Sequence, residues 1–226
     1  RRYYDDMAGV FCDMAATRIG RMACGVEAAA DIRLSYRWSL SFAASAGRYK
    51  FIRNPRITVI SDVDNSVVDA RAVSHLRGCT PGGAPQLTAC AELGYFGPKG
   101  WGFKTSAGYA GARYVEPSLL RRTERIARQG GTTREMFDAF TRQQRLGDAF
   151  TLDAALFKTF WFDRSRLTAS LILRNLLGDG DIVYSAYESQ RVRRIRSGDT
   201  LCYAPHAARL TYAYPRSFYL TVSYRF

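Results

Sequence analysis

The sequence of 226 residues predicts an all-β fold of antiparallel strands, and three observations support this. First, apolar and polar residues alternate strictly from Ser217 to Phe226, which places them on opposite faces of a strand. Second, the same alternation recurs at strand spacing through much of the chain. Third, 14 Tyr and 13 Phe residues against seven Pro are typical of strands. No Pro/Gly-rich linker divides the chain, so we expect residues 1–226 to form one domain.

The strands expected in the first half of the chain come mostly in pairs. The first strand stands alone, and short turns near Arg37 and Asn65 separate the members of the first two pairs. The expected strands are Arg2–Ala15, Met22–Tyr36, Trp38–Tyr49, Arg56–Val63, Arg71–Arg77, Ala84–Phe96 and Trp101–Val115. The last two join through Gly97-Pro98-Lys99-Gly100, a strong turn signal.

The second half completes a count of about ten strands. Phe150–Phe162 and Ser165–Leu177 flank the polar turn Asp163-Arg164-Ser165, and Ser217–Phe226 ends the chain. In the 165–177 segment, Leu and Ala at positions 167, 169, 171 and 173 share one face. Within the long segment Glu116–Asp148, apolar residues from position 136 to 140 are spaced as in a short helix spanning Arg134–Arg145.

The connections between these strands alternate in length. The tight turns lie near Arg37, Asn65, Gly97–Gly100 and Asp163–Ser165, and the long connections are Arg48–Pro55, Arg77–Pro85, Glu116–Asp148 and Gly178–Pro215. If Phe226 lies in the periplasm, every short turn falls on that side and every long loop falls outside. This sorting is typical of outer-membrane barrels. The sequence therefore predicts a transmembrane antiparallel β-barrel.

Hydropathy is compatible with strands in a membrane but not with helices. No stretch approaches the roughly 20 consecutive apolar residues that a membrane helix needs. Barrel strands look only half hydrophobic, because lipid-facing and lumen-facing residues alternate. A mean hydropathy of −0.22 fits such strands.

A net charge of +13 is compatible with binding of nucleic acid, yet the chain lacks a recognised nucleic-acid-binding motif. Its denser basic runs lie at Arg121–Arg145 and Arg191–Arg196. A lumen wall and loops that face anionic lipopolysaccharide account for the same charge, so we expect no nucleic-acid partner. A soluble basic β protein that binds nucleic acid remains an alternative, and it predicts salt-sensitive binding.

Cysteine, histidine and catalytic patterns indicate no cofactor, no metal and no enzyme activity. The five Cys residues form no CxxC pair, and His75 and His206 stand far apart. The sequence contains no Gly-x-Ser-x-Gly, phosphate-binding or HExxH motif. Cys12 and Cys24 are equidistant from Arg18, so a hairpin turning there would bring them opposite each other. Either a cross-strand disulfide or two unpaired small residues fits this spacing.

Several segments resemble, in the same order, the TonB-dependent receptors of Bacteroidetes, including their SusC/RagA-like members. The segments are Ile19–Glu27, Asn54-Pro55 with Asp64-Asn65, Gly78–Gln86, Tyr95–Trp101, Leu120-Arg121-Arg122-Thr123-Glu124, Asn175-Leu176-Leu177 with Tyr187–Arg191, and Tyr214–Phe226. The sequence departs from the family pattern at Arg174, where Asn is common, and at the insertion Cys79–Gly83.

The resemblance implies a 22-stranded barrel of which this chain supplies the C-terminal part, without the plug domain and the TonB box. It implies active import of a scarce nutrient (glycan, peptide or siderophore) across the outer membrane of a Gram-negative bacterium. The implied partners are outer-membrane lipid, the TonB complex through the missing N-terminal region and a surface lipoprotein. We therefore expect the chain to begin inside a longer protein. A small self-contained porin or adhesin barrel of about ten strands is the alternative.

Two sets of residues are candidates for function. A C-terminal strand ending in an aromatic residue is the signal that outer-membrane assembly machinery recognises, by pairing with the free strand edge. The residues that carry it are Phe218, Leu220, Val222, Tyr224 and Phe226. The second set are arginines expected on external loops, where they would contact an anionic ligand or lipid phosphate: Arg121, Arg122, Arg191, Arg193, Arg194 and Arg196.

Overall fold

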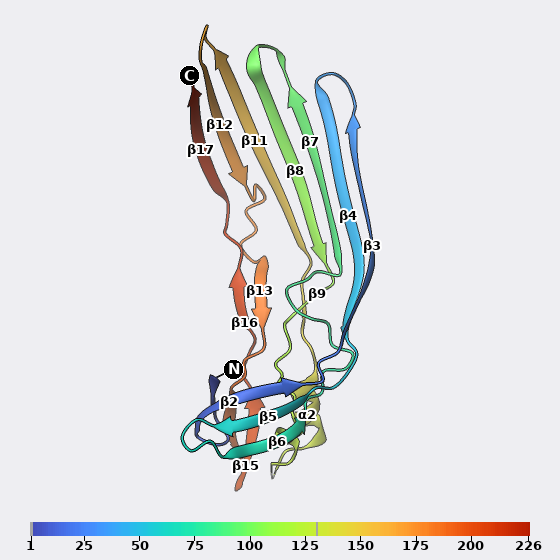
Figure 1. Cartoon of the computed structure of the whole chain (residues 1–226), viewed down its shortest axis with the longest axis vertical. Helices are drawn as coiled ribbons and strands as arrows, with labels where there is room; N and C mark the ends of the chain where they lie inside the picture. Colours follow the sequence, from blue (N-terminus) through green and yellow to red (C-terminus); the bar gives the residue numbers. More distant parts are fainter. Residues whose placement is uncertain (1, 130) are drawn as a thin grey trace.

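The computed structural model describes residues 2–129 and 131–226, and it is mostly β, with 59% of the chain in antiparallel sheets. The chain divides into two regions stacked along the long axis (Figure 1). One is a single seven-stranded sheet. The other, which we call the cap, comprises residues 2–19, 52–86, 112–129, 131–148 and 175–214. In the part of the chain that is described, none of the helices has the length and apolar character of a membrane span.

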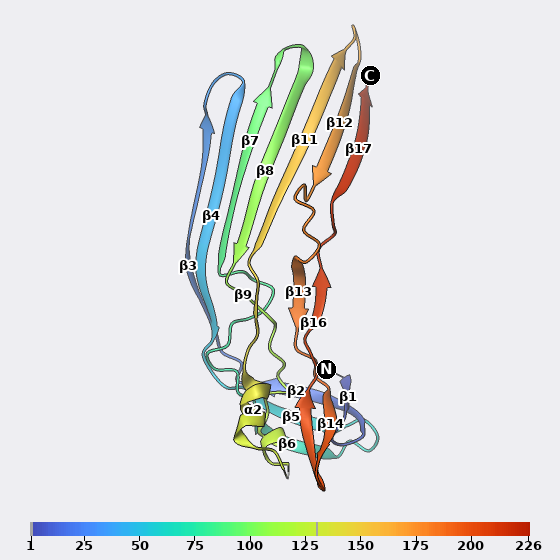
Figure 2. The same cartoon turned by 180° about the vertical axis from the view of Figure 1, so that it is seen from behind.

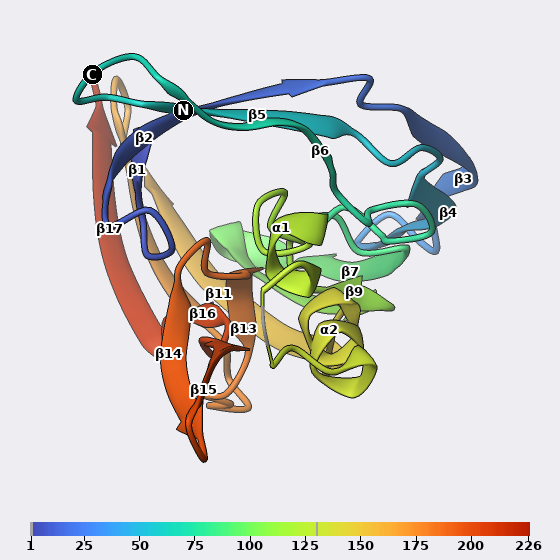
Figure 3. The ribbon, with the colours of Figure 1, turned by 90° about the horizontal axis from the view of Figure 1, so that it is seen from below.

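The seven-stranded sheet is an antiparallel meander with the order β17-β12-β11-β8-β7-β4-β3. Its strands are β3 (Arg21–Arg33), β4 (Trp38–Phe51), β7 (Leu87–Phe96), β8 (Trp101–Gly111), β11 (Ala149–Trp161), β12 (Arg166–Arg174) and β17 (Ser217–Arg225). Seen along the long axis, the strands follow a curve from β17 to β3 (Figure 3). Each strand has nine residues or more, the length that crosses a bilayer when tilted.

Three tight hairpins lie at the end of this sheet that carries the C-terminus, whereas the long connections run into the cap (Figures 1 and 2). The β3–β4, β7–β8 and β11–β12 turns are the ones expected near Arg37, Gly97–Gly100 and Asp163–Ser165. The 97–100 turn is a 3-10 turn in which Lys99 adopts a positive φ of 56°. Short turns at one end and long loops at the other are therefore a property of this sheet.

The cap contains the remaining elements. Its four-stranded sheet has the order β1-β2-β5-β6, with β1 (Arg2–Asp5), β2 (Val10–Thr17), β5 (Arg56–Ser61) and β6 (Val67–Val73). Three two-stranded pairs follow: β9 (Arg113–Tyr114) with β10 (Arg145–Leu146), β13 (Val183–Tyr187) with β16 (Arg209–Tyr212), and β14 (Val192–Ser197) with β15 (Thr200–Pro205). The helices are α1 (Glu124–Ala127) and α2 (Arg134–Thr141).

The buried apolar clusters of the described residues all lie in the cap. One joins the four-stranded sheet to the segment before α1, through Cys12, Ile57, Val59 and Leu120. A second packs both helices on the β14–β15 hairpin, through Ile126, Phe140, Val192 and Tyr203. A third holds β9, β10 and β13 together, through Val115, Leu146 and Ala186. The cap therefore has the packed interior of a water-soluble domain.

Most strands were predicted within a few residues, and the short helix at Arg134–Arg145 is confirmed as α2. Three expectations were wrong. Arg2–Ala15 is two strands, because Asp5 accepts hydrogen bonds from the amides of Met7 and Ala8 and turns the chain there. The Asn65 turn lies in the cap and not at the hairpin end, since β5 and β6 bury apolar residues against Leu120. The segment 178–215 was expected as a loop and contains β13 to β16.

The expected hairpin between Cys12 and Cys24 is also absent. The chain does turn at Arg18, whose φ is 60°, but it passes there from one sheet to another. Cys12 pairs with Tyr3 and Ser61 in the four-stranded sheet, whereas Cys24 pairs with Arg48 in the seven-stranded sheet. Both are free thiols, so the disulfide alternative is wrong.

Candidate functional site

The seven-stranded sheet has one continuous apolar face. The register places every second residue of neighbouring strands side by side: Leu171, for example, lies between Leu156 and Leu220. Across the sheet this face comprises Ile32, Ala30, Ala28 and Val26; Trp38, Leu40, Phe42, Ala44 and Ala46; Tyr95, Leu93, Ala91, Ala89 and Leu87; Trp101, Phe103, Thr105, Ala107 and Tyr109; Phe150, Leu152, Ala154, Leu156, Lys158 and Phe160; Leu167, Ala169, Leu171 and Leu173; and Tyr224, Val222, Leu220 and Phe218.

The opposite face of the same sheet is mainly polar, although Phe96, Phe157, Trp161, Ile172 and Tyr219 also lie on it. It carries Glu27, Asp31 and Arg33; Ser39, Ser41 and Ser45; Thr88 and Glu92; Lys104 and Ser106; Thr151, Asp153 and Thr159; Thr168, Ser170 and Arg174; and Thr221, Ser223 and Arg225. Ion pairs cross between neighbouring strands, with Lys104 Nζ 2.6 Å from Glu92 and Arg174 3.6 Å from Asp153. The two faces are thus built for two different surroundings.

Aromatic rings border the apolar face at both ends. At the hairpin end, Trp38 packs on Tyr95 and Phe103, with ring centroids 4.8 and 5.6 Å apart. Toward the cap, the register aligns Tyr109 with Phe150. Six residues separate Phe103 from Tyr109, about 20 Å at the rise of a strand. An apolar band of roughly 25 Å between two aromatic girdles is characteristic of outer-membrane barrels.

Lys158 is the charged residue among those just named for this apolar face, and its side chain reaches out of the band; Arg48 and Lys50 follow on the same face of β4, nearer the cap. Its Nζ lies 4.9 Å from the ring centroid of Trp101 and 5.3 Å from that of Phe160, and it donates to the backbone oxygen of Lys99 in the hairpin turn. A long stem along apolar surface with the ammonium group directed to the border is the behaviour of a lysine at a membrane interface.

Four of the five assembly-signal residues lie on one strand at the edge of the sheet, and Phe226 directly follows that strand. β17 pairs with β12 on one side, and among the described strands it has no neighbour on the other. Phe218, Leu220, Val222 and Tyr224 project from the apolar face with more than half of their surface exposed, and Phe226 is 96% exposed. The free edge and the exposed aromatic end are both present in this strand.

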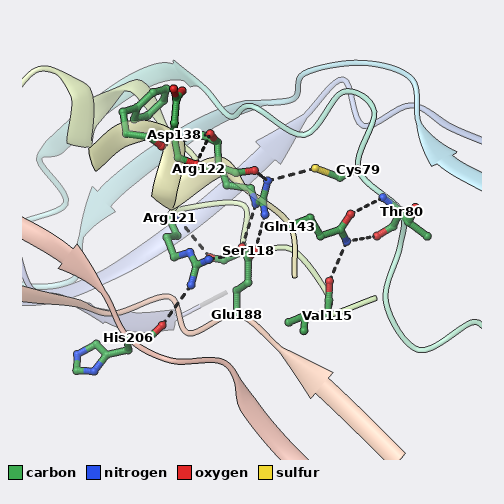
Figure 4. Close-up of polar contacts among 12 residues, drawn as sticks. Cys79, Thr80, Val115, Ser118, Arg121, Arg122, Asp138, Gln143, Glu188 and His206 are labelled. Carbon is green, nitrogen blue, oxygen red and sulfur yellow. Dashed lines mark hydrogen bonds and ion pairs between the residues drawn. The ribbon is translucent and has the colours of Figure 1, made fainter. Parts of the chain in front are cut away.

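A buried ion-pair network holds the cap together (Figure 4). The guanidinium of Arg122 is fully buried, and its Nε donates to the Glu188 carboxylate at 2.9 Å while a terminal nitrogen contacts the other carboxylate oxygen. Arg122 also donates to the backbone oxygen of Thr141 and to Cys79 Sγ. Glu188 accepts a further hydrogen bond of 2.8 Å from the Ser118 amide. The network joins segments 66 residues apart.

Arg121 is the second cation of this network. It is 7% exposed, its terminal nitrogens lie 3.2 Å from Glu188 and 3.3 Å from the backbone oxygen of His206, and its Nε has no partner among the described residues. Burial lowers the pKa of the Arg121 guanidinium, although Glu188 opposes that shift. An arginine stays protonated in proteins, so two cations share one carboxylate and one positive charge is in excess.

A second buried cluster ties the N-terminal strand to α1. Asp5 accepts from Tyr3 at 2.7 Å and from Arg125 at 2.6 Å, and Arg125 also lies 3.3 Å from Asp69. Burial would raise the pKa of the Asp5 carboxyl, but the hydrogen bonds from Arg125, Ala8 and Tyr3 outweigh it and hold that pKa below its usual value. Burial and the bond to Asp5 raise the pKa of Tyr3.

The arginines expected to contact a ligand therefore fall into two groups. Arg121 and Arg122 were expected on an external loop and are instead buried, because Glu188 supplies the opposite charge inside the cap. Arg191, Arg193, Arg194 and Arg196 are exposed, as expected. Asp6 fixes two of these four, since it pairs with Arg191 at 2.6 Å and its backbone oxygen accepts from Arg194. The β14–β15 hairpin extends away from the sheet (Figure 3).

Two pockets of the cap have a size that small solutes occupy and are lined by both acidic and basic side chains. The larger, about 600 Å³, lies beside Arg21, Phe51, Glu116 and Gln190. Burial raises the pKa of the Glu116 carboxyl, although hydrogen bonding from the Gly82 amide opposes the shift. The second, about 390 Å³, lies over Arg121 and is taken up below. Within residues 2–129 and 131–226, no three His, Cys, Asp or Glu side chains gather as they would around a metal ion.

No family model, no curated protein and no solved structure matches the chain. The segments Leu120–Glu124 and Tyr187–Arg191, which carry part of the resemblance noted in the sequence, nevertheless meet in space through Arg122 and Glu188. Sequence reasoning missed that contact. Glu188 lies in a segment expected to be a loop, where nothing in the sequence indicates that a glutamate is buried. The one available signal was its charge, which is opposite to that of Arg121 and Arg122.

Proposed function

We propose that the chain forms part of the wall of an outer-membrane β-barrel that imports a nutrient in a TonB-dependent manner, with the cap on the external side. The observation that carries the proposal is the two-faced sheet. Its apolar face, about 20 Å between aromatic rows, is suited to lipid, and its charged face is suited to a water-filled lumen. Energy coupling and the remaining wall would come from parts of the protein outside residues 1–226.

The hydrophobic effect supports this interpretation of the sheet. A soluble sheet with one apolar face buries that face against a second layer. The buried clusters of the described residues lie elsewhere, in the cap. Leu171 and Ser170 are adjacent in β12 but belong to opposite faces. The proposal therefore places Leu171 in lipid and Ser170 in the water-filled lumen.

The test is to place a single nitroxide label at position 169, 170, 171 or 172 of β12, in a variant with the native cysteines replaced, in outer-membrane vesicles. Labels at 169 and 171 should be relaxed by oxygen, which concentrates in lipid, and labels at 170 and 172 by a water-soluble nickel complex. A period of two along the strand supports the proposal. Equal access of the nickel complex to all four positions would overturn it.

A mass measurement separates active import from a small self-contained porin or adhesin. An antibody to segment 116–148 is used to detect the native protein in outer-membrane extracts. A species several times heavier than 25.4 kDa supports the importer, since a plug and further strands need that length. A species near 25.4 kDa would contradict the importer and support the small self-contained barrel instead.

A further inference from the structure

We infer that the pocket of about 390 Å³ over Arg121 binds the anionic group (carboxylate, sulfate or phosphate) of a soluble molecule. That the pocket binds an anion is argued from its geometry alone. That the bound molecule is imported rests on the proposed function. The pocket lies in the cap, outside the apolar band of the sheet, so a solute and not a membrane lipid is its occupant.

The floor of the pocket has an excess of positive charge. Arg121 and Arg122 together face one carboxylate, that of Glu188. Arg122 binds both oxygens of Glu188, and the Ser118 amide donates to one of them as well, so the carboxylate is already well neutralised. A buried charge without a matching countercharge is costly, and an incoming anion would remove that cost.

A hydrogen-bond donor at the floor is also unused. The Nε–H of Arg121 is buried and donates to no group among the described residues, whereas the terminal nitrogens of the same guanidinium are engaged. Leaving a buried donor unpaired is unfavourable, and charged donors bind oxyanions more strongly than neutral ones do. Small adjustments of the Arg121 side chain would direct that donor to a ligand.

The rim of the pocket adds one further positive charge, that of Arg142. Arg142, Gln144 and His206 line it, and all three are exposed. Glu188 is the acid among the lining residues, and it is the one already paired. A cationic floor with a cationic and donor-rich rim disfavours an amine and attracts an anion.

Arg142 and His206 are held at the rim by different parts of the cap. Arg142 follows α2 and its amide donates to the Asp138 backbone oxygen at 2.9 Å, while the backbone oxygen of His206 accepts from Arg121 at 3.3 Å. The described structure gives the Arg142 side chain no hydrogen bond or ion pair. That guanidinium is therefore free to meet a solute.

The experiment is equilibrium dialysis of radiolabelled sulfate and phosphate against the whole native protein, purified from outer membranes in detergent. Saturable binding of one site per chain is expected, with competition by acetate. Arg121→Gln should weaken it about tenfold or more, and Arg142→Gln, which alters an exposed side chain and leaves the cap fold intact, by about three- to tenfold. Arg164→Gln is the control, an exposed arginine in the β11–β12 turn at the end of the sheet away from the cap, and should change nothing.

Absence of saturable binding would overturn the inference. So would an equal loss in Arg142→Gln and Arg164→Gln, because it would indicate general attraction to a basic protein. The nitroxide experiment on β12 does not involve this pocket. A sheet that lies in lipid while the cap binds no anion would therefore refute the site and leave the proposed function standing.

Discussion

The sheet and the cap use similar residues in opposite ways. In the cap, apolar side chains face inward in three clusters, and even arginines are buried with their countercharge. In the seven-stranded sheet, apolar side chains of one face point outward together, and Phe218, Leu220 and Val222 are 75%, 70% and 61% exposed. The difference teaches that the cap is organised around a buried interior, whereas the sheet presents a largely apolar face that no other described element covers.

The largest expected effect is on the cap, from loss of the buried carboxylate that Arg121 and Arg122 share. Glu188→Gln leaves both guanidinium groups buried without a countercharge, which should destabilise the cap by about 3–5 kcal/mol. The readout is urea-dependent proteolysis of segment 131–148 in the membrane-embedded protein. Asp62→Asn, which breaks the exposed pair with Arg2, is the control and should cost less than about 1 kcal/mol. Equal effects would mean that burial of the network contributes nothing.

The next effect concerns the sheet and contrasts two adjacent residues. Leu171 lies on the apolar face near the middle of β12, and Ser170 lies on the mainly polar face. Leu171→Arg should reduce the stability of the folded protein in bilayers by about 2–4 kcal/mol, whereas Ser170→Arg should have little effect. Urea titration of the heat-modifiable folded band measures both. If Ser170→Arg is the more damaging of the two, the assignment of faces is reversed.

The third effect is pH-dependent and belongs to the cap. The folded pKa of Asp5 is depressed, so this carboxylate contributes stability above its unfolded pKa of about 3.9, and that contribution is lost as the pH falls through the folded pKa. Asp5→Asn should destabilise the cap by about 2 kcal/mol at pH 7. The difference from the native protein should shrink as the pH falls below about 4. Protease resistance of segment 2–17 from pH 7 to pH 2 measures it. A constant difference across that range would contradict the electrostatic origin.

The sequence predicted the sheet far better than the cap, for a physical reason. Alternation with a period of two is a local property of a strand, so Ser217–Phe226 identified β17 to within one residue, and Ser165–Leu177 identified β12 to within three. The cap depends on contacts between segments distant in the chain. The pairing of Arg122 with Glu188 and the packing of Leu120 on Val59 leave no periodic trace, so both arginines were expected at the surface.

Charge density was a weaker guide than alternation for the same reason. The basic run Arg191–Arg196 was correctly expected to be exposed, but the Asp6 turn that fixes it is 185 residues away. The apolar spacing in segment 134–145 did predict α2, because a helix face is again a local pattern. Whether the sheet closes into a barrel with further strands remains a prediction from the sequence and the resemblance.

The smallest expected effect tests whether α2 is held by its own sequence or by the cap. Thr133 caps the helix, since its hydroxyl accepts a hydrogen bond of 3.2 Å from the Met136 amide. Thr133→Ala should cost about 1 kcal/mol, and Thr133→Ser, which keeps the oxygen, should cost much less. Hydrogen exchange of the amides at positions 135–137 measures the local opening. Because an eight-residue helix is marginal alone, Phe140 in the buried cluster must supply most of its stability. A loss that greatly exceeds 1 kcal/mol would mean that the cap relies on this one hydrogen bond more than on packing.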